Sequence, residues 1–341
     1  MRTQGVASIG GKICRPVALG IMHSTSRAQG LPAVQKSNCA AVISAYHPPR
    51  GLVDRVSALV AQFQVVVIAD DGGGDEHGVL QRCRDEGAMT VELGSNQGIA
   101  AALNRAVEEI KAGHAGIDYI VTFDQDSTPP ADLIAVFGEA WAEAVSAGLL
   151  VGSVSPGRIN GALIGRAEPG AAYFPVSEPI QSGTLVPLSV MQEIGGLDES
   201  LFIDGVDTDM YWRLRARGYV AIAASRADLS HELGARSQAA LLGRPLRRRG
   251  EPIMIMQSAP FRYYYLVRNR LELVRRYGRS RPLPMVRGLA LDLRHLAVVL
   301  VFGTGRRRRL QYAARGLSDG LRGRRGRMTT MGNGGKVAGD A

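Results

Sequence analysis

Two aspartates that follow a buried apolar segment are the residues of this sequence that best suit metal chemistry. Asp124 and Asp126 come directly after 119–123, a run of apolar and β-branched residues that predicts a buried strand. An Asp-x-Asp at a strand end can present both carboxylates to one hard cation, and ligands of open α/β sheets collect at the carboxyl ends of the strands. A cation held there would keep enough charge to bind a diphosphate.

A helix cap is the alternative that these residues leave open. Asp126, Ser127 and Thr128 are all of types that cap helices, and Pro129 and Pro130 suit a first helical turn. The choice between a metal ligand and a cap therefore depends on the rest of the chain.

Other acidic pairs also follow predicted strands. Asp70 and Asp71 come after an apolar segment over 64–69 and precede three glycines, which allow a sharp turn close to a ligand. Asp204 and Asp207 follow a short apolar run in the second half of the chain, and a helix is predicted from Asp207 onward. A solvent-exposed turn is the alternative for the first pair. For Asp209, in the first turn of the helix predicted from Asp207, the alternative is a favourable position in the field of the helix dipole.

The alternation of elements predicts the fold class. Four strands and four helices alternate in the first half, which indicates a mostly parallel, doubly wound α/β sheet with a nucleotide-sized crevice at the strand ends. The predicted strands cover 39–46, 64–69, 89–93 and 119–123, and the predicted helices cover 51–63, 76–86, 99–112 and 131–147. Short apolar runs in the second half predict mixed or antiparallel strands over 149–154, 171–176, 181–186 and 219–224. The glycine motifs of dinucleotide-binding folds and of P-loops do not occur, which disfavours both classes.

Two further features have a functional and a structural reading. Asn96 and Gly98 belong to a polar loop before the helix predicted over 99–112, where free N–H groups could bind phosphate and an ordinary cap is the alternative. His231 lies in a polar segment after the strand predicted over 219–224, and it is either a ligand or a structural histidine.

Charge divides the chain into an acidic part and a basic tail. Residues 241–341 carry 23 Lys and Arg against 5 Asp and Glu, a net charge of +18, whereas the first 240 residues carry −8. No apolar run is long enough to span a bilayer, and three cysteines without a pairing pattern suit a reducing cytosol. We expect a disordered extension over 1–37, a catalytic domain over 38–240, a basic helical region over 241–327 and a disordered tail over 328–341.

The ordered set of these motifs resembles the inverting GT-A glycosyltransferases of family 2, most closely their bacterial rhamnosyltransferase branch. The resemblance extends from about Ala40 to Arg327 and includes motifs at the polar loop, at both acidic clusters and in the basic tail. They are Ala45-Tyr-His-Pro48, Asp70-Asp-Gly-Gly73, Asn96-Gln-Gly98, Asp124-Gln-Asp-Ser127, Gln181-Ser-Gly-Thr184, Gly195-Gly-Leu-Asp198, Phe202-Ile-Asp204 with Val206-Asp207, and Arg262-Tyr-Tyr-Tyr265.

The resemblance implies a role for each matched position. It assigns donor-nucleotide binding to Tyr46, Asp70, Asp71, Asn96, Gly98 and Asp124, the acceptor and sugar pocket to Gly183, Gly196 and Asp204, metal binding to Asp126 and His231, and the catalytic base to Asp207. The implied cofactor is Mg²⁺ or Mn²⁺. Inversion needs a carboxylate to take the proton of the attacking hydroxyl and a cation to neutralise the departing nucleoside diphosphate.

Four positions depart from the usual family pattern. His47 stands where an Asn is usual, and Gly73 and Gly74 replace a Ser-Thr pair, so contacts to the base and ribose are expected to differ. Val206 replaces the Glu of a common Glu-Asp pair, which leaves Asp207 as the single strong candidate for the base.

The implied activity is transfer of a sugar, with L-rhamnose from dTDP-L-rhamnose as the first choice, to a lipid-linked glycan or polysaccharide acceptor. The alternatives are a UDP- or GDP-sugar donor, or a non-catalytic sugar-nucleotide-binding subunit. The basic and aromatic tail suits contact with an anionic membrane at the cytoplasmic face of the inner membrane, and packing on the catalytic domain is the alternative. A nucleic-acid partner is not expected, because the tail contains no recognisable RNA-binding module.

Overall fold

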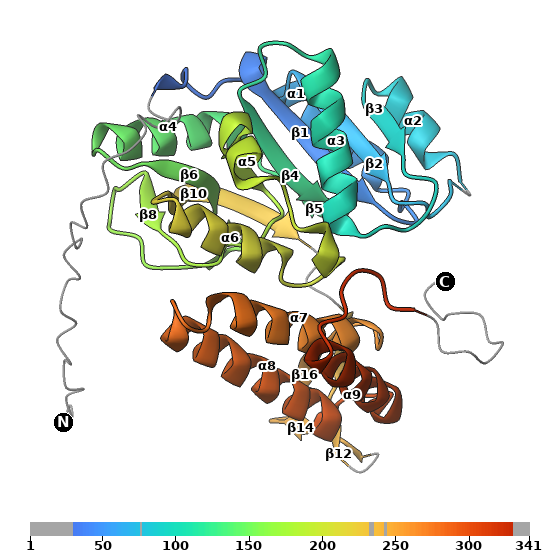
Figure 1. Cartoon of the computed structure of the whole chain (residues 1–341). Coiled ribbons are helices and arrows are strands. Elements are labelled where there is room, and N and C mark those ends of the chain that lie inside the picture. The colour runs from blue at the N-terminus through green and yellow to red at the C-terminus, as the bar shows by residue number, and fades with distance from the viewer. Residues whose placement is uncertain (1–29, 76, 232–234, 242–243, 330–341) are drawn as a thin grey trace.

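The computed structural model describes residues 30–75, 77–231, 235–241 and 244–329, and its centre is one sheet of ten strands (Figure 1). The strand order is β3-β2-β1-β4-β9-β6-β10-β5, with β7 paired to β6 and β8 paired to β10. The strands are β1 (Cys39–Ala45), β2 (Val65–Asp70), β3 (Met89–Glu92), β4 (Tyr119–Asp124), β5 (Ser127–Thr128), β6 (Val151–Ile159), β7 (Ala162–Leu163), β8 (Tyr173–Pro175), β9 (Thr184–Pro187) and β10 (Val220–His231).

The amino-terminal half of the sheet is parallel, so its functional side chains emerge at one edge. Strands β3, β2, β1 and β4 run in the same direction, and Ala45 at the end of β1 is in register with Asp70 of β2. On the other side of β1, Ser44 is in register with Asp124 of β4. The two predicted acidic clusters therefore flank the carboxyl end of one central strand.

The second half of the sheet is mixed, as its short and interrupted apolar runs predict. Strand β9 is antiparallel to both β4 and β6, whereas β6 and β10 are parallel to each other. The short strand β5 is antiparallel to the end of β10. This last pairing brings the residues directly after β4 beside a strand that ends more than 100 residues later in the chain.

Helices cover both faces of the sheet because alternate strand residues point to opposite sides. In β1, Ala41 and Ile43 join the core under α1, α2 and α4, whereas Ala40 and Val42 join the core under α3, α5 and α6. The helices are α1 (Leu52–Gln62), α2 (Val79–Asp85), α3 (Ile99–Gly113), α4 (Leu133–Ser146), α5 (Leu188–Ile194) and α6 (Val206–Ala216). The predicted α/β class with a mostly parallel, doubly wound sheet is confirmed, and with the carboxyl-terminal helices it agrees with the GT-A fold that the resemblance implies.

A helical layer follows the sheet and lies against α6 (Figure 1). It contains α7 (Arg262–Tyr277), α8 (Pro282–Phe302) and α9 (Arg306–Leu321). Three two-stranded ribbons precede it, formed by β11 (Ala235–Gln238) with β16 (Met254–Gln257), β12 (Ala240–Leu241) with β13 (Arg244–Pro245), and β14 (Arg247–Arg248) with β15 (Glu251–Pro252). Among the residues described, no helix has the length and apolar character needed to cross a membrane.

Buried charges join this layer to the sheet. Asp209 of α6 is fully buried and accepts hydrogen bonds from Arg213 Nε at 2.7 Å, Arg276 Nη1 at 2.9 Å and Tyr277 Oη at 2.8 Å. Arg276 and Tyr277 are at the end of α7, where Arg276 also pairs with Asp198. The dipole of α6 alone therefore does not explain this acid, which connects two layers of the fold.

Two sequence-based boundaries need correction. Val34 is buried and Tyr119 Oη donates a hydrogen bond to the Pro32 carbonyl at 2.6 Å, so the described residues 30–37 pack on the sheet although they were expected in a disordered extension. The rest of that extension, residues 1–29, and residues 330–341 of the expected tail lie outside the described residues. A helix beginning at Pro129 is also wrong, because Ser127 and Thr128 form β5 and α4 begins at Leu133.

Candidate active site

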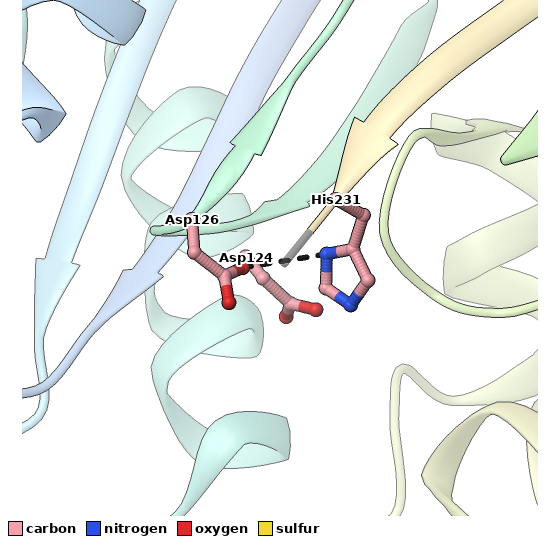
Figure 2. Close-up of side chains that lie close together, drawn as sticks. All are labelled: Asp124, Asp126 and His231. Carbon is pink, nitrogen blue, oxygen red and sulfur yellow. Dashed lines mark ion pairs between the residues drawn. The ribbon is translucent and has the colours of Figure 1, made fainter. Parts of the chain in front are cut away.

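Three potential metal ligands meet where β4 and β10 end. Figure 2 shows the side chains of Asp124, Asp126 and His231 converging, and one ligand atom of each lies within 4.8 Å of the others. Asp124 is the last residue of β4, and His231 is the last residue of β10. The sequence predicted the two aspartates as neighbours, and the long strand β10 adds the histidine.

Pairing between β5 and β10 sets this geometry. His231 is in register with Ser127 across the antiparallel pair, which places the ring beside the residue that follows Asp126. The backbone N–H of His231 donates to Asn160 Oδ1 at 3.0 Å, and Asn160 Nδ2 donates to the His231 carbonyl at 2.7 Å. The Asn160 side chain therefore fixes the backbone of His231 through both its N–H and its carbonyl group.

Serines fix the orientation of the ring and of the strand end. Ser127 Oγ lies 2.8 Å from His231 Nδ1 and 2.7 Å from Ser182 Oγ, and Ser182 Oγ accepts the backbone N–H of Asp124 at 3.0 Å. Sequence reasoning missed Ser182, although it belongs to the Gln181-Ser-Gly motif. This chain of contacts links three separate segments of the sheet around the carboxylates.

The donor set fits a hard divalent cation. Asp126 Oδ1 is buried and has no hydrogen-bond partner among the described residues, although it lies 3.3 Å from His231 Nδ1. Buried carboxylate oxygens normally find a partner, so an oxygen without one suggests that a ligand completes the site. Two carboxylates with an imidazole are ligands that Mg²⁺ or Mn²⁺ can accept, with solvent or substrate oxygens filling other positions.

The electrostatics of the cluster also favour an added positive charge. Burial raises the pKa of Asp124, the charge of His231 lowers it, and the charge of Asp126 raises it. The net pKa is about 6. Two carboxylates so close to each other repel when both are ionised, and a cation relieves that repulsion.

Asp207 lies in the first turn of α6 beside the same region. Its backbone neighbour Thr208 donates an N–H to Asp207 Oδ1 at 2.8 Å, and Gly205, the residue before the helix, has a positive φ of 84°. Protein atoms crowd the carboxyl group although the residue is partly exposed, and this burial raises the pKa of Asp207 to about 6. Such a carboxylate is ionised at neutral pH and is more basic than an ordinary aspartate.

Arg262 adds a positive charge to this region, and its residue type and spacing had suggested no site role. It forms a two-point ion pair with Asp204, with Nε 3.2 Å from Oδ2 and a second contact from Nη2 to Oδ1. Burial lowers the pKa of Arg262, and Asp204, Asp124 and Asp207 raise it to give a net upward shift. One guanidinium from α7 therefore acts electrostatically on three of the predicted site carboxylates.

The predicted nucleotide-binding turn is held by hydrogen bonds to the strand ends. The Gln125 side chain accepts the backbone N–H of Tyr46 at 2.9 Å and donates to the Tyr46 carbonyl at 3.0 Å. Asp70 Oδ1 accepts the backbone N–H of Gly73 at 3.2 Å, where a β-carbon on Gly73 would collide with the backbone of His47. The structure thus brings Tyr46 and Asp70 to the same edge of the sheet as Asp124.

Asp71 differs from its neighbour, because both of its carboxylate oxygens already have partners. They accept the backbone N–H groups of Gln97 at 2.6 Å and of Gly98 at 2.9 Å. The next N–H, that of Ile99, donates to the Phe202 carbonyl at 2.9 Å. The start of α3 is therefore occupied by internal contacts, and we do not retain it as a phosphate site. Asn96 Oδ1 in the same loop is buried without a hydrogen-bond partner among the described residues.

Three predicted glycines lie in different surroundings. Gly98 and Gly183 have positive φ values of 97° and 75°, and a β-carbon on either would clash, with Phe202 or with Pro156 respectively. Gly183 donates its N–H to the Thr122 carbonyl on β4 at 2.7 Å, which puts it near the cluster of Asp124, Asp126 and His231. Gly196 instead packs against Asn104 of α3 and accepts from Arg213 Nη1 at 2.6 Å. Its contacts are those of a structural glycine between α3 and α6.

Comparison with known proteins agrees with the motif set. No family model matches the chain. The chain is 28% identical over 304 residues to the dTDP-rhamnosyl transferase RfbF of Shigella flexneri. The aligned region covers 84% of this chain and 96% of RfbF.

The solved structures that resemble this chain have lower sequence identity to it than RfbF has. S. aureus TarS matches 70% of this chain with a TM-score of 0.45 and 12% identity, and the chain spans 40% of the TarS length. A TarS fragment in complex with UDP-GlcNAc covers 84% of this chain with a TM-score of 0.44 and 12% identity, and 92% of that fragment is matched. Glucosyl-3-phosphoglycerate synthase from Mycobacterium tuberculosis with Mg²⁺ and UDP covers 57% of this chain and 72% of its own length, with a TM-score of 0.38 and 16% identity.

Proposed function

We propose that this chain, a family 2 GT-A glycosyltransferase of the rhamnosyltransferase branch, transfers L-rhamnose from dTDP-L-rhamnose with inversion at the anomeric carbon. The proposed acceptor is a hydroxyl of a lipid-linked glycan or of a growing polysaccharide. The observation that carries the proposal is the convergence of Asp124, Asp126 and His231 at one sheet edge, with Asp207 acting electrostatically on Asp124.

Asp126 and His231 are the proposed protein ligands of Mg²⁺ or Mn²⁺, and Asp124, which lies beside them, is proposed to contact the ribose. A bound divalent cation supplies neutralisation of the charge that develops on the departing nucleoside diphosphate. Ser127 and Ser182 hold the imidazole and the end of β4 in position for this role through their hydroxyl contacts.

Asp207 is the proposed general base. Its carboxylate would take the proton of the acceptor hydroxyl as that oxygen attacks the anomeric carbon, while the bond from that carbon to the diphosphate oxygen breaks. General-base assistance of this kind contributes about 10²- to 10⁴-fold to the rate. Asp204 and Arg262 stand beside this base, so they are proposed to line the acceptor side of the pocket.

Donor recognition is proposed for the turn after β1 and β2. Tyr46, Asp70 and the backbone around Asn96 would contact the base and ribose. Asp71 supports this surface indirectly, because it holds the loop at Gln97 and Gly98 in place. We propose cytoplasmic localisation, which suits the two buried free cysteines, Cys39 and Cys83.

The deciding experiment measures donor binding and slow donor hydrolysis for dTDP-, UDP- and GDP-sugars, with Mn²⁺, with Mg²⁺ and with a chelator. The natural chain is compared with Asp126→Ala, His231→Ala and the control His77→Ala, whose side chain is exposed on the loop before α2. We expect selective binding of dTDP-L-rhamnose, dependence on the cation, and loss of that dependence in the first two variants only.

Other outcomes separate the alternatives. Selective binding of a UDP- or GDP-sugar would reject the rhamnose donor while retaining the transferase. Binding of a nucleotide sugar without any hydrolysis would favour the non-catalytic sugar-nucleotide-binding subunit. If no nucleotide sugar binds under any cation condition, both the proposed reaction and that alternative are wrong.

A further inference from the structure

Exposed apolar side chains are concentrated in the helical layer and its ribbons. Fourteen large hydrophobic residues are exposed in the described part of the chain, and twelve of them follow residue 240. Scattered exposed apolar residues are normal on soluble proteins, but a concentration in one region marks an interaction surface. The catalytic sheet contributes only Met89 and Leu163 to this set.

Helix α8 carries five of these fourteen residues, and four of the five lie on one face. The exposed fractions are 82% for Leu283, 64% for Val286, 57% for Leu293 and 43% for Val301. Their spacing at about 100° per residue puts them within one side of the helix. Met285 and Val299 are buried on the opposite side, which packs against the rest of the layer.

The same outward face carries positive charge and no acid. Arg287 and Arg294 are exposed, and on the helical wheel they lie beside Leu283 and Val301, between these residues and the exposed Leu291. Asp292, the one acidic residue of α8, faces the opposite way and its Oδ2 is 2.6 Å from Arg270 Nε. An apolar stripe that contains arginines and excludes carboxylates is suited to the boundary between acyl chains and anionic head groups.

We infer that this α8 face, defined by Leu283, Val286, Arg287, Leu293, Arg294 and Val301, binds the surface of an anionic lipid bilayer. The inference deepens the proposed function and rests on it for the lipid-linked acceptor. A second copy of the chain is a poorer occupant, because a symmetric contact through α8 would bring the arginines of both copies together without an acid to pair them. Anionic head groups supply the missing negative charge along the whole stripe.

The geometry limits how the bilayer is bound. Helix α8 is 21 residues long but lies on α7 and α9, so only its outer face is available. Binding would therefore be peripheral, with the apolar side chains entering the head-group boundary and the arginines contacting phosphate. Surface electrostatics decays within a Debye length, so added salt should weaken the association.

The test is co-sedimentation of the full chain with vesicles of phosphatidylcholine alone and of phosphatidylcholine mixed with phosphatidylglycerol. We expect binding to the anionic vesicles that decreases with salt. Arg287→Gln with Arg294→Gln should lower partitioning by about 25-fold, taking about fivefold for each arginine at an anionic surface. Leu283→Gln with Val286→Gln and Leu293→Gln should lower it at least about tenfold.

Leu163→Gln is the matched control, because Leu163 is a large exposed side chain of the catalytic sheet, 41% exposed on β7. It should bind vesicles as the natural chain does. Helical content and thermal midpoint are measured for every variant, and the arginine pair tests the inference even if the apolar triple variant folds poorly. Donor hydrolysis in the absence of vesicles should be unchanged in the α8 variants.

Three results would overturn the inference. They are absence of binding to anionic vesicles, equal binding to both vesicle types, or unchanged binding by both α8 variants. A dimer that the α8 substitutions dissociate, without vesicle binding, would assign the face to a second copy instead. Failure of donor hydrolysis with intact vesicle binding would reject the proposed reaction but would retain the inference that the α8 face binds a membrane.

Discussion

Arg262 of α7 forms a two-point ion pair with Asp204, three residues before Asp207 in the chain. The charge of Asp204 raises the pKa of Asp207, and the guanidinium compensates that charge. A helix from the basic region of the chain thus sets the electrostatic surroundings of the proposed base. Sequence proximity alone would assign that influence only to residues of the catalytic domain.

Substitutions of Asp204 and of Arg262 should shift the pH profile of kcat/KM in opposite directions. Asp204→Asn removes a negative charge near Asp207, so its pKa falls and the acidic limb of kcat/KM moves to lower pH. Arg262→Ala leaves Asp204 uncompensated, so the pKa of Asp207 rises and the limb moves to higher pH. The measurement is kcat/KM for the donor and acceptor as a function of pH. Shifts in the same direction in both variants would contradict this electrostatic role.

Asp207→Asn should abolish most activity and increase stability. The folded-state pKa of about 6 exceeds the ordinary value of 3.8, so the folded protein binds more protons between these values and loses stability as the pH rises through them. Asn has no proton to lose, and its Oδ1 can still accept from Thr208. We expect a gain of about 1–2 kcal/mol above pH 6, reduced for partial exposure, and a loss of turnover of at least about 10²-fold.

Urea unfolding at several pH values checks the stability part of this prediction. The difference between Asp207→Asn and the natural chain should shrink as the pH falls from 6 toward 3.8 and should be smallest below 3.8, where the aspartate is mostly protonated in both states. A difference that stays constant with pH would mean that packing, and not desolvation of a charge, accounts for it.

Asp71→Ala should act through the loop before α3. Two backbone N–H groups lose a charged acceptor, and hydrogen bonds to charged groups contribute more than neutral ones, so we expect a loss of about 2–3 kcal/mol. Asp75→Ala is the matched control, because Asp75 caps α2 through the N–H groups of Val79 and Leu80. Both variants should unfold earlier on heating, but only Asp71→Ala should also weaken donor binding. Unchanged stability with weakened binding would instead make Asp71 a direct ligand.

Asp209→Ala should be the most destabilising of these changes. It leaves Arg213 and Arg276 without their shared buried carboxylate, and breaking a buried charge pair costs about 3–5 kcal/mol. Glu109→Ala is the control, since Glu109 forms an i, i+4 pair with Arg105 on the surface of α3 and should cost at most about 1 kcal/mol. Chemical denaturation measures both. Similar small losses would show that the layers are held by apolar packing alone.

Periodicity in the sequence predicted most of the sheet because its strands are nearly continuous apolar runs and its helices are amphipathic. The aspartates Asp124 and Asp126 were found because a polar residue directly after such a run is conspicuous. His231 was harder to assign, since β10 continues through Arg226 and Asp228 beyond the apolar stretch that marked its start. That continuation depends on pairing with β6 and β5, which no local pattern reveals.

Long-range contacts also explain the remaining differences. Arg262 and Ser182 reach the site only through tertiary packing, so residue type and spacing gave no reason to select them as site residues. Asp71 looked like a ligand because it shares a strand end with Asp70, yet the neighbouring loop uses both of its oxygens. Gly196 shares a motif with site residues in the family resemblance, but its contacts lie between α3 and α6.

The order of β4, β9, β6 and β10 in the sheet has a consequence during synthesis of the chain. The parallel amino-terminal strands can assemble as soon as β4 leaves the ribosome. The other edge of β4 stays unpaired until β9 is synthesised. His231 arrives later still, and Asp204 stays uncompensated until Arg262 emerges. A nascent chain can therefore complete much of its sheet well before it is able to act on a sugar nucleotide.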